Sequence, residues 1–355
     1  MKKTISYLTI VLFLVLCILP SAGMLILGES GAAANEILSA APRLHDRDGR
    51  FNAQVLNDTA DYIADRFALR QQFVTAWAKL HTALFHSSAE DQILLGENDW
   101  LFYTATLDDY AGQHLSETEL DRIAANLTAI QDYVESQGKQ FLFTVAPNKN
   151  SLYPEYMASR YTAAHEQSNI RLLEPRLQEA GIHYVDLFSL YGGEPVRYYE
   201  TDSHWTAQGA AMAADRLLAA MDRSGGYAAG PFAENGTHPG DLYEMLYPAA
   251  EDPETQIDYA GKLNYTTRSD PKGGDAITIE SDRSGADGSL LCWRDSFGIA
   301  LYPYLADSFG HALFSRSAAY DFTRFDLQDY DVILIEIVER NLPQLAADCV
   351  IFPTD

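Results

Sequence analysis

Cysteine is scarce in this chain, which has three among its 355 residues. So small a number excludes a compact fold held together by several disulfides. No Cys-x-x-Cys pair and no cluster of cysteine with histidine suggests a zinc site, and we expect neither a metal nor another cofactor. Whether Cys292 and Cys349 pair with each other is left open by the sequence.

Basic residues are also few, with 25 Lys and Arg against 50 Asp and Glu, a net charge of −25. A nucleic-acid-binding protein gains affinity by neutralising phosphates, so this balance argues against a nucleic-acid partner. It argues equally against docking onto an anionic membrane through a basic patch. Apolar residues make up 47% of the chain and aromatics 12%, which is typical of a folded globular protein.

A long apolar run lies at the amino end, from Ile5 to Leu27, and Lys2 and Lys3 precede it. Its roughly 23 residues suffice to cross a bilayer. The positive charges would stay in the cytoplasm, so everything after Gly28 would lie outside. We expect residues 1–28 to be a single-pass membrane anchor with an extracytoplasmic domain. A small-residue site at 32–34 leaves cleavage of a signal segment, and secretion, as the alternative.

Residues 29–49 are Gly/Ala-rich and then charged, which is typical of a linker, and residues 50–355 alternate between helical and strand patterns. We expect buried strands at 141–146, 182–188, 290–293 and 332–338, a hairpin at 93–103, and helices at 120–134, 164–180, 206–221 and 297–305, with a helical stripe within 52–85. The alternation predicts an α/β fold with a mostly parallel sheet. The stretch 224–288, rich in Gly, Pro, Asp and Ser, interrupts this rhythm and suggests an insertion or lid.

A polar segment, Thr201 to Thr206, holds an Asp-x-His pair, Asp202 and His204. In an extended segment, side chains two residues apart point the same way. Such a carboxylate could orient an imidazole and stabilise its cation. The pair could equally be a surface pair or a loop cap, because about 0.8 such pairs is expected by chance in a chain of this composition.

A second polar segment follows the apolar run 290–293 and contains Arg294, Asp295 and Ser296. A serine at a strand-to-helix junction lies near main-chain amides that could hold the oxyanion of an acyl-transfer intermediate. It could equally be a helix N-cap. Together, the two segments suggest Ser296 as nucleophile, His204 as general base and Asp202 as its orienting partner. Arg294 could bind substrate or pair with an acidic neighbour.

At these residues the chain resembles the DHHW protein family and its relatives, the alginate O-acetyltransferase proteins with an SGNH-hydrolase-like domain. The matching segments occur in order along residues 50–345: DYIADRFALRQQF (61–73), GENDWLFY (96–103), APNKNSLYP (146–154), YVDL (184–187), DSHW (202–205), PGDL (239–242), DSF (295–297) and IEIVERN (335–341). Ser203 stands where the family's naming motif has His, which leaves Asp202 and His204 in place.

The resemblance implies a circularly permuted SGNH-hydrolase-like fold in which Ser296, His204 and Asp202 form the catalytic triad. It also implies that Lys149, Tyr153 and Trp205 lie near the substrate. The acidity of the chain is unexpected for an alginate-like acceptor, because a polyanion would be repelled at long range. A neutral glycan or a locally basic groove is therefore favoured.

The function expected is that of a membrane-anchored extracytoplasmic O-acetyltransferase, which modifies a cell-surface or exported polysaccharide through an acyl-serine intermediate. By family analogy, a multi-span membrane-bound O-acyltransferase would be the partner that supplies acetyl groups. Two alternatives stay open: a carbohydrate acetylesterase, which would use the same triad with water as acceptor, and a non-catalytic glycan-binding protein of the cell envelope.

Overall fold

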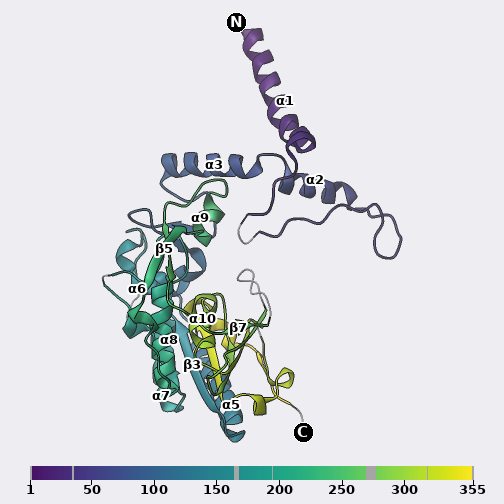
Figure 1. Ribbon diagram of the computed structural model, residues 1–355. Helices are drawn as coiled ribbons and strands as arrows, with labels where there is room; N and C mark the ends of the chain where they lie inside the picture. Colours follow the sequence, from purple (N-terminus) through teal and green to yellow (C-terminus); the bar gives the residue numbers. More distant parts are fainter. Residues whose placement is uncertain are drawn as a thin grey trace. The chain divides into compact units, whose positions relative to one another are not determined.

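The computed structural model (Figure 1) describes residues 2–33, 36–163, 168–193, 195–268, 277–317 and 319–353. The chain divides into two compact units, each of which is described by itself. The first unit combines the residues up to Leu94 with Pro239–Asp252, and the second combines Leu95–His238 with the residues from Pro253 onward.

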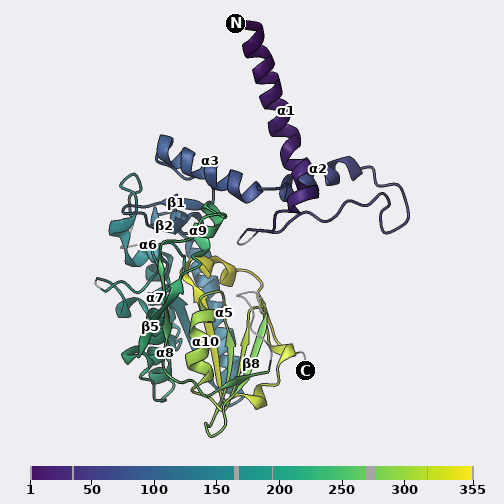
Figure 2. The same ribbon diagram turned by 45° about the horizontal axis from the view of Figure 1, so that its top comes forward.

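Helices dominate the first unit, and Figure 2 labels them. They are α1 (Lys2–Leu27), α2 (Val55–Arg66), α3 (Arg70–Phe85) and α9 (Asp241–Leu246). The region 52–85, where a helical stripe is expected, forms two helices, α2 and α3, and Leu69 between them adopts a left-handed backbone conformation with φ of 66°.

None of the helices formed by the described residues is both long enough and apolar enough to cross a membrane. The anchor expected at residues 1–28 therefore stays a prediction.

The second unit contains the remaining elements, and β1 (Ile93–Leu95) spans the boundary between the two units along the sequence. Its strands are β2 (Leu101–Tyr103), β3 (Gln140–Ala146), β4 (Tyr184–Val185), β5 (Phe232–Thr237), β6 (Thr255–Tyr259), β7 (Thr266–Thr267), β8 (Thr278–Asp282), β9 (Ser289–Trp293), β10 (His311–Ser315), β11 (Tyr320–Asp321), β12 (Val332–Val338) and β13 (Val350–Ile351). Its α-helices are α4 (Leu107–Tyr110), α5 (Glu117–Ser136), α6 (Lys149–Leu152), α7 (Asn169–Glu179), α8 (Ala207–Ala220) and α10 (Gly298–Ala306). Short 3₁₀ turns include η4 (Phe188–Leu190) and η8 (Glu339–Ala346).

A seven-stranded sheet of order β4-β3-β12-β9-β10-β8-β7 forms the centre of this unit. The pairs from β4 to β10 are parallel, whereas β8 and β7 are antiparallel. The expected α/β fold with a mostly parallel sheet is thus confirmed, and its antiparallel edge comes from the stretch 224–288. In that stretch, β5 and β6 also form an antiparallel pair of their own.

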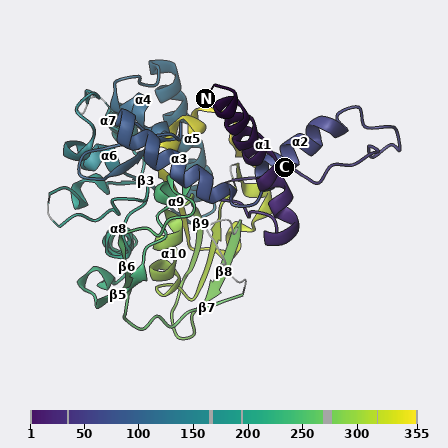
Figure 3. The same cartoon turned by 90° about the horizontal axis from the view of Figure 1, so that it is seen from above.

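Helices cover both faces of the sheet because its central strands are apolar on both sides (Figure 3). Alternate residues of the strands, such as Phe143, Trp293 and Ile335, pack into one core with residues of α5 and α7. On the other side, α8 and α10 lie against each other, and the Tyr304 hydroxyl donates to the carbonyl of Ala207. Cys292 and Cys349 are both buried and free, which answers the pairing question left open above.

The carboxyl ends of four adjacent parallel strands meet at one edge of the sheet. Val338 pairs with Ala146, and Trp293 pairs with Ile335 on one side and Ser315 on the other. Polar segments follow each of these strands in the sequence. Ligands of such sheets bind at this edge, so the topology gathers these segments where a site is expected.

Candidate active site

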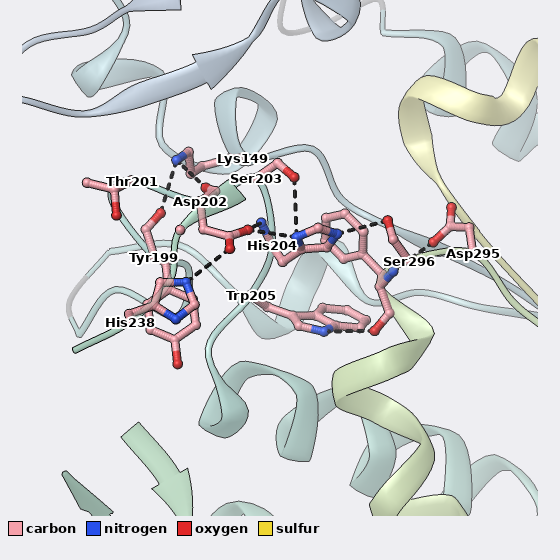
Figure 4. A network of polar contacts seen from close by, with 12 residues as sticks. Lys149, Tyr199, Thr201, Asp202, Ser203, His204, Trp205, His238, Asp295 and Ser296 are labelled. Carbon is pink, nitrogen blue, oxygen red and sulfur yellow. Dashed lines mark hydrogen bonds and ion pairs between the residues drawn. The ribbon is translucent and has the colours of Figure 1, made fainter. Parts of the chain in front are cut away.

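A chain of hydrogen bonds joins Ser296, His204 and Asp202 (Figure 4). The Ser296 Oγ lies 2.8 Å from the Nε2 of His204. On the other side of the ring, Nδ1 lies 2.7 Å from the Oδ1 of Asp202. The structure therefore brings together three residues that the sequence separates by up to 94 positions, in the order that the sequence analysis expected.

The histidine segment is a tight loop that leads into α8. Asp202 Oδ1 accepts the main-chain N–H of His204 at 2.8 Å, so one carboxylate fixes both the backbone and the ring. Two main-chain bonds close the loop, from the N–H of Tyr199 to the carbonyl of His204 and from the N–H of Thr206 to the carbonyl of Arg197. The Thr206 side chain accepts from the N–H of Gly209 and caps α8.

Lys149 is buried beneath this loop. Its ammonium donates to the carbonyls of Tyr199, Glu200 and Asp202 at 3.0, 2.9 and 2.6 Å. From the other direction, the Glu254 carboxylate accepts the main-chain N–H groups of Glu200 and Thr201. The peptide planes are thus oriented between a cation and an anion.

Lys149 was expected near the substrate, and in the structure its ammonium is surrounded by main-chain carbonyls while the side chain is 4% exposed. Tyr153 is fully buried, its ring contacts Trp100, and its hydroxyl accepts the N–H of Arg197. Both residues support the histidine loop from within the core, and their expected place near the substrate stays a prediction.

The serine segment is held by the neighbouring carboxylate of Asp295. Its Oδ1 accepts the N–H of Phe297, and its Oδ2 accepts the N–H of Val338 and the side-chain amide of Asn341. The side chain of Ser296 does not cap α10, because α10 begins at Gly298 and its hydroxyl points to His204 instead. The Phe297 N–H is also engaged, so it is not available for an oxyanion.

His238 is a residue of this network that the sequence analysis missed. Its Nε2 lies 3.0 Å from the second oxygen of Asp202, and its Nδ1 lies 2.6 Å from Oε1 of Gln256. The ring stacks on that of Tyr199, with centroids 3.5 Å apart and planes 7° from parallel. The one signal in the sequence was its position immediately before the PGDL segment.

The surrounding hydrogen bonds determine the protonation of His238. Gln256 donates its amide nitrogen to the carboxylate of Asp258, so its oxygen faces the ring and must accept from Nδ1. The carboxylate of Asp202 must accept from Nε2, so both ring nitrogens carry protons. In agreement, although burial favours the neutral ring, the bonds to Asp202 and Gln256 raise the pKa of His238.

Asp202 consequently lies between two imidazole rings. Burial by itself would raise the pKa of its carboxyl group. The charge and hydrogen bonds of His204, together with those of His238, outweigh burial and hold the pKa of Asp202 well below its usual range. The carboxylate is therefore ionised and positioned to keep the Nε2 of His204 directed at Ser296.

A cavity of about 570 Å³ opens onto this chain of hydrogen bonds. Aromatic side chains form much of its wall, namely Tyr199, Trp205, Tyr259, Tyr265, Phe297 and Tyr304. Trp205 lies beside the site as expected, although it is only 1% exposed and its indole donates to the carbonyl of Phe297. Arg294 lines a second cavity, which Ser296 also borders.

This arrangement is chemically able to activate a hydroxyl group. A neutral imidazole at 2.8 Å can take the Ser296 proton, and the ionised carboxylate on its far side stabilises the imidazolium that forms. Nothing in that step requires a metal or an organic cofactor. The adjoining cavity has room for the group that the alkoxide would attack.

Comparison with known proteins identifies relatives of this chain. Residues 93–279, just over half of the chain, match the family model described as "SGNH hydrolase-like domain, acetyltransferase AlgX". The matched region contains Asp202 and His204, and Ser296 follows it. A probable alginate O-acetylase AlgJ of Pseudomonas syringae is 28% identical over 160 residues, which are 44% of this chain and 40% of that protein.

Solved structures share the fold at low sequence identity. A DHHW family protein from Eubacterium siraeum matches with a TM-score of 0.54 and 14% identity, over 74% of this chain and 96% of that one. Bacillus cereus PatB1 with a sulfonyl adduct matches with a TM-score of 0.53 and 17% identity, over 70% of this chain and 94% of that one. The resemblance seen in the sequence is confirmed, and the chain belongs to the family of SGNH hydrolase-like domains of the acetyltransferase AlgX type.

Proposed function

We propose that this protein is a serine-dependent O-acyltransferase that acetylates a polysaccharide. The observation that carries the proposal is the hydrogen-bonded chain from Ser296 through His204 to Asp202 at the wall of a cavity. Membership of the AlgX-type family and the relatives described as probable alginate O-acetylases support transfer to a sugar hydroxyl. Because the chain spans less than half the length of those relatives, their substrate is not carried over.

In the first half-reaction, the Ser296 oxygen attacks the carbonyl carbon of an acyl donor while His204 Nε2 takes the hydroxyl proton. The tetrahedral intermediate collapses, the donor's leaving group accepts that proton, and an acyl-serine ester is formed. The main-chain N–H of Ser296, to which the described part of the chain offers no acceptor, is the donor we assign to the oxyanion. In the second half-reaction a sugar hydroxyl attacks the ester, and Ser296 regains its proton through His204.

We also propose that residues 5–27 anchor the protein to a membrane, with the domain on the extracytoplasmic side. The support is the apolar run and the two lysines before it. Since an acetyl donor made inside the cell has to cross the membrane, a multi-span acyltransferase is the partner that this placement would require. Cell fractionation and protease accessibility test the placement: a domain degraded only after the cells are lysed would contradict it.

Covalent labelling tests the acyl-serine step. A fluorophosphonate probe should label Ser296, and both Ser296→Ala and His204→Ala should abolish labelling. The exposed Ser136→Ala serves as the matched control and should label like the unchanged protein. If Ser296 is not labelled and Ser296→Ala changes nothing in cells, the protein is a glycan-binding protein and not an enzyme.

Product analysis separates transfer from hydrolysis. The protein is supplied with 4-nitrophenyl acetate and an oligosaccharide, and acetylated sugar and free acetate are measured. Acetylated sugar should appear, and Ser296→Ala should lower its rate by about 10³-fold or more. Release of free acetate alone, with every oligosaccharide offered, would identify an acetylesterase.

A further inference from the structure

One face of α3 carries a stripe of large apolar side chains that is open to solvent. At the angular spacing of an α-helix, four residues fall within about 60° of one another around the axis. They are Phe73, Trp77, Leu80 and Leu84, and each is between 46% and 63% exposed. Soluble proteins seldom expose a continuous apolar patch, and such a patch typically marks a surface that another molecule or a membrane covers.

The opposite face of α3 is packed within its own unit. Thr75 and Ala78 are buried there, and the Thr75 hydroxyl oxygen accepts the main-chain N–H of Ala249 at 2.9 Å. The ammonium of Lys79 lies 5.8 Å from the ring centroid of Tyr247. The segment that contains α9 therefore covers this face of α3, so the helix is held with its apolar stripe facing outward.

Within the same unit, the chain that leaves α1 is hydrogen-bonded to the residues around the start of α3. The main-chain N–H of Ser30 donates to the carbonyl of Arg66 at 3.0 Å. The side-chain amide of Gln71 donates to the carbonyl of Gly31 at 3.1 Å. The first turn of α3 thus lies within hydrogen-bond distance of the residues that directly follow the apolar run. An anchor at residues 5–27 would consequently place α3 at the membrane surface.

The composition of α3 suits contact with lipid. The chain has 50 acidic residues, yet none of them lies in this helix, where a carboxylate facing a bilayer would lose its hydration at a large cost. Trp77 belongs to the stripe, and tryptophan is enriched at the boundary between membrane and water. Burial of apolar side chains would drive such binding without a basic patch, in agreement with the acidic balance of the chain.

We propose that α3 is an interfacial helix whose stripe of Phe73, Trp77, Leu80 and Leu84 lies on the surface of a lipid bilayer. The inference rests on the proposed function, because it takes residues 5–27 as the membrane anchor. Helices of this kind lie in the plane of the membrane, with the apolar face at the boundary of headgroups and acyl chains. The anchor and the stripe would together give the first unit two attachments to the membrane, which would hold it in one orientation.

Tryptophan quenching tests this contact. The full-length protein is reconstituted into phosphatidylcholine vesicles whose acyl chains carry bromine, which quenches an indole that touches it. Of the four tryptophans, Trp100, Trp205 and Trp293 are no more than 2% exposed, so Trp77 is the one open to a quencher. The brominated lipid should quench an emission component that Trp77→Phe removes, and acrylamide dissolved in the water should not quench that component.

A charge within the stripe should detach the helix. Leu80→Glu and Leu84→Glu should each abolish the quenching of Trp77 by brominated lipid and make it accessible to acrylamide, because a carboxylate does not enter the bilayer surface without losing hydration. Gln72→Glu is the matched control. It adds the same charge to an exposed position of α3 outside the stripe, and it should leave the quenching unchanged.

The remaining outcomes would overturn the interfacial helix. Quenching of Trp77 by acrylamide alone would place the stripe in water, and shielding from both quenchers would mean that a second copy or a partner protein covers it. A protein that does not float with the vesicles on a density gradient would contradict the anchor as well. Fluorophosphonate labelling of Ser296 is measured in the same vesicles, so failure of this inference and failure of the proposed function are distinguishable.

Discussion

The two segments that meet at the Ser296–His204 hydrogen bond are held by charges of opposite sign. On the histidine side, the buried ammonium of Lys149 donates hydrogen bonds to three main-chain carbonyls. On the serine side, the carboxylate of Asp295 gathers two main-chain N–H groups and a side-chain amide. Backbone groups that face an internal charge thus fix both loops, and on the histidine side the Glu254 carboxylate also accepts two main-chain N–H groups from the opposite direction.

Replacing Lys149 by Met should have the largest effect, because it keeps the bulk of the side chain but leaves three carbonyls without a charged donor. We expect the free energy of unfolding to fall by about 4–5 kcal/mol, which urea denaturation would measure. The exposed Lys262→Met is the control. A loss no greater than that of the control would mean that the loop is held by its other bonds.

The buried carboxyl of Glu339 belongs to the histidine side, because it supports the short helix that carries Lys149. It accepts from the N–H of Asn148 and the hydroxyl of Ser151, and burial raises its pKa to about 7. The pKa of Glu339 is higher in the folded protein than in the unfolded chain, where it is about 4.3. The protonated carboxyl therefore stabilises the fold fully below that pKa, and this stabilisation is lost as the pH rises to about 7. The free energy of unfolding falls by about 3 kcal/mol over this pH range.

Glu339→Gln should remove that pH dependence. The difference in unfolding free energy between the variant and the unchanged protein should shift in favour of the variant by about 3 kcal/mol between pH 4 and pH 8. Urea unfolding at a series of pH values measures it. A difference that stays constant with pH would contradict an ionisation buried in the fold.

On the serine side, Asp295→Asn should lower the free energy of unfolding by about 2 kcal/mol, which is less than the loss expected for Lys149→Met. The remaining oxygen can still accept N–H bonds, whereas the new amide nitrogen faces N–H donors. Urea denaturation would measure this loss, with the exposed Asp329→Asn as the control variant. We also expect a lower rate of fluorophosphonate labelling, since the orientation of Ser296 depends on this carboxylate. Equal labelling of both variants would place the control of Ser296 elsewhere.

The smallest expected effect concerns the second imidazole on Asp202. Removing the His238 cation leaves Asp202 with its full charge directed at His204, so His204 becomes more basic. His238→Gln should therefore move the acid limb of the pH–rate profile to higher pH, and the turnover should fall about tenfold at pH values below the shifted limb, where His204 is protonated. His238→Ala should lower the turnover further because the hydrogen bond is lost as well. An unmoved pH profile in both variants would indicate a purely structural role.

Much of the fold and part of the site were predictable from sequence. The central strands 141–146 and 332–338 are uniformly apolar, and Asp202, His204 and Ser296 lie in short polar segments between clear elements. The roles of Lys149 and Tyr153 were not, because burial depends on packing that no local pattern encodes. His238 was missed since it follows β5, a strand in the aperiodic stretch 224–288.

The peptide groups of Glu200 and Thr201 lie between the Lys149 ammonium and the Glu254 carboxylate, and this limits how fast the histidine segment can move. Loops ordinarily exchange their amide hydrogens with solvent by local opening, at rates far above those of the core. Here the amides of Glu200 and Thr201 face one carboxylate while the carbonyls around them face one ammonium, so neither peptide can turn without separating charges. The segment that carries the imidazole should accordingly retain deuterium-exchange protection like that of a strand, and the ring would be in place before any ligand arrives.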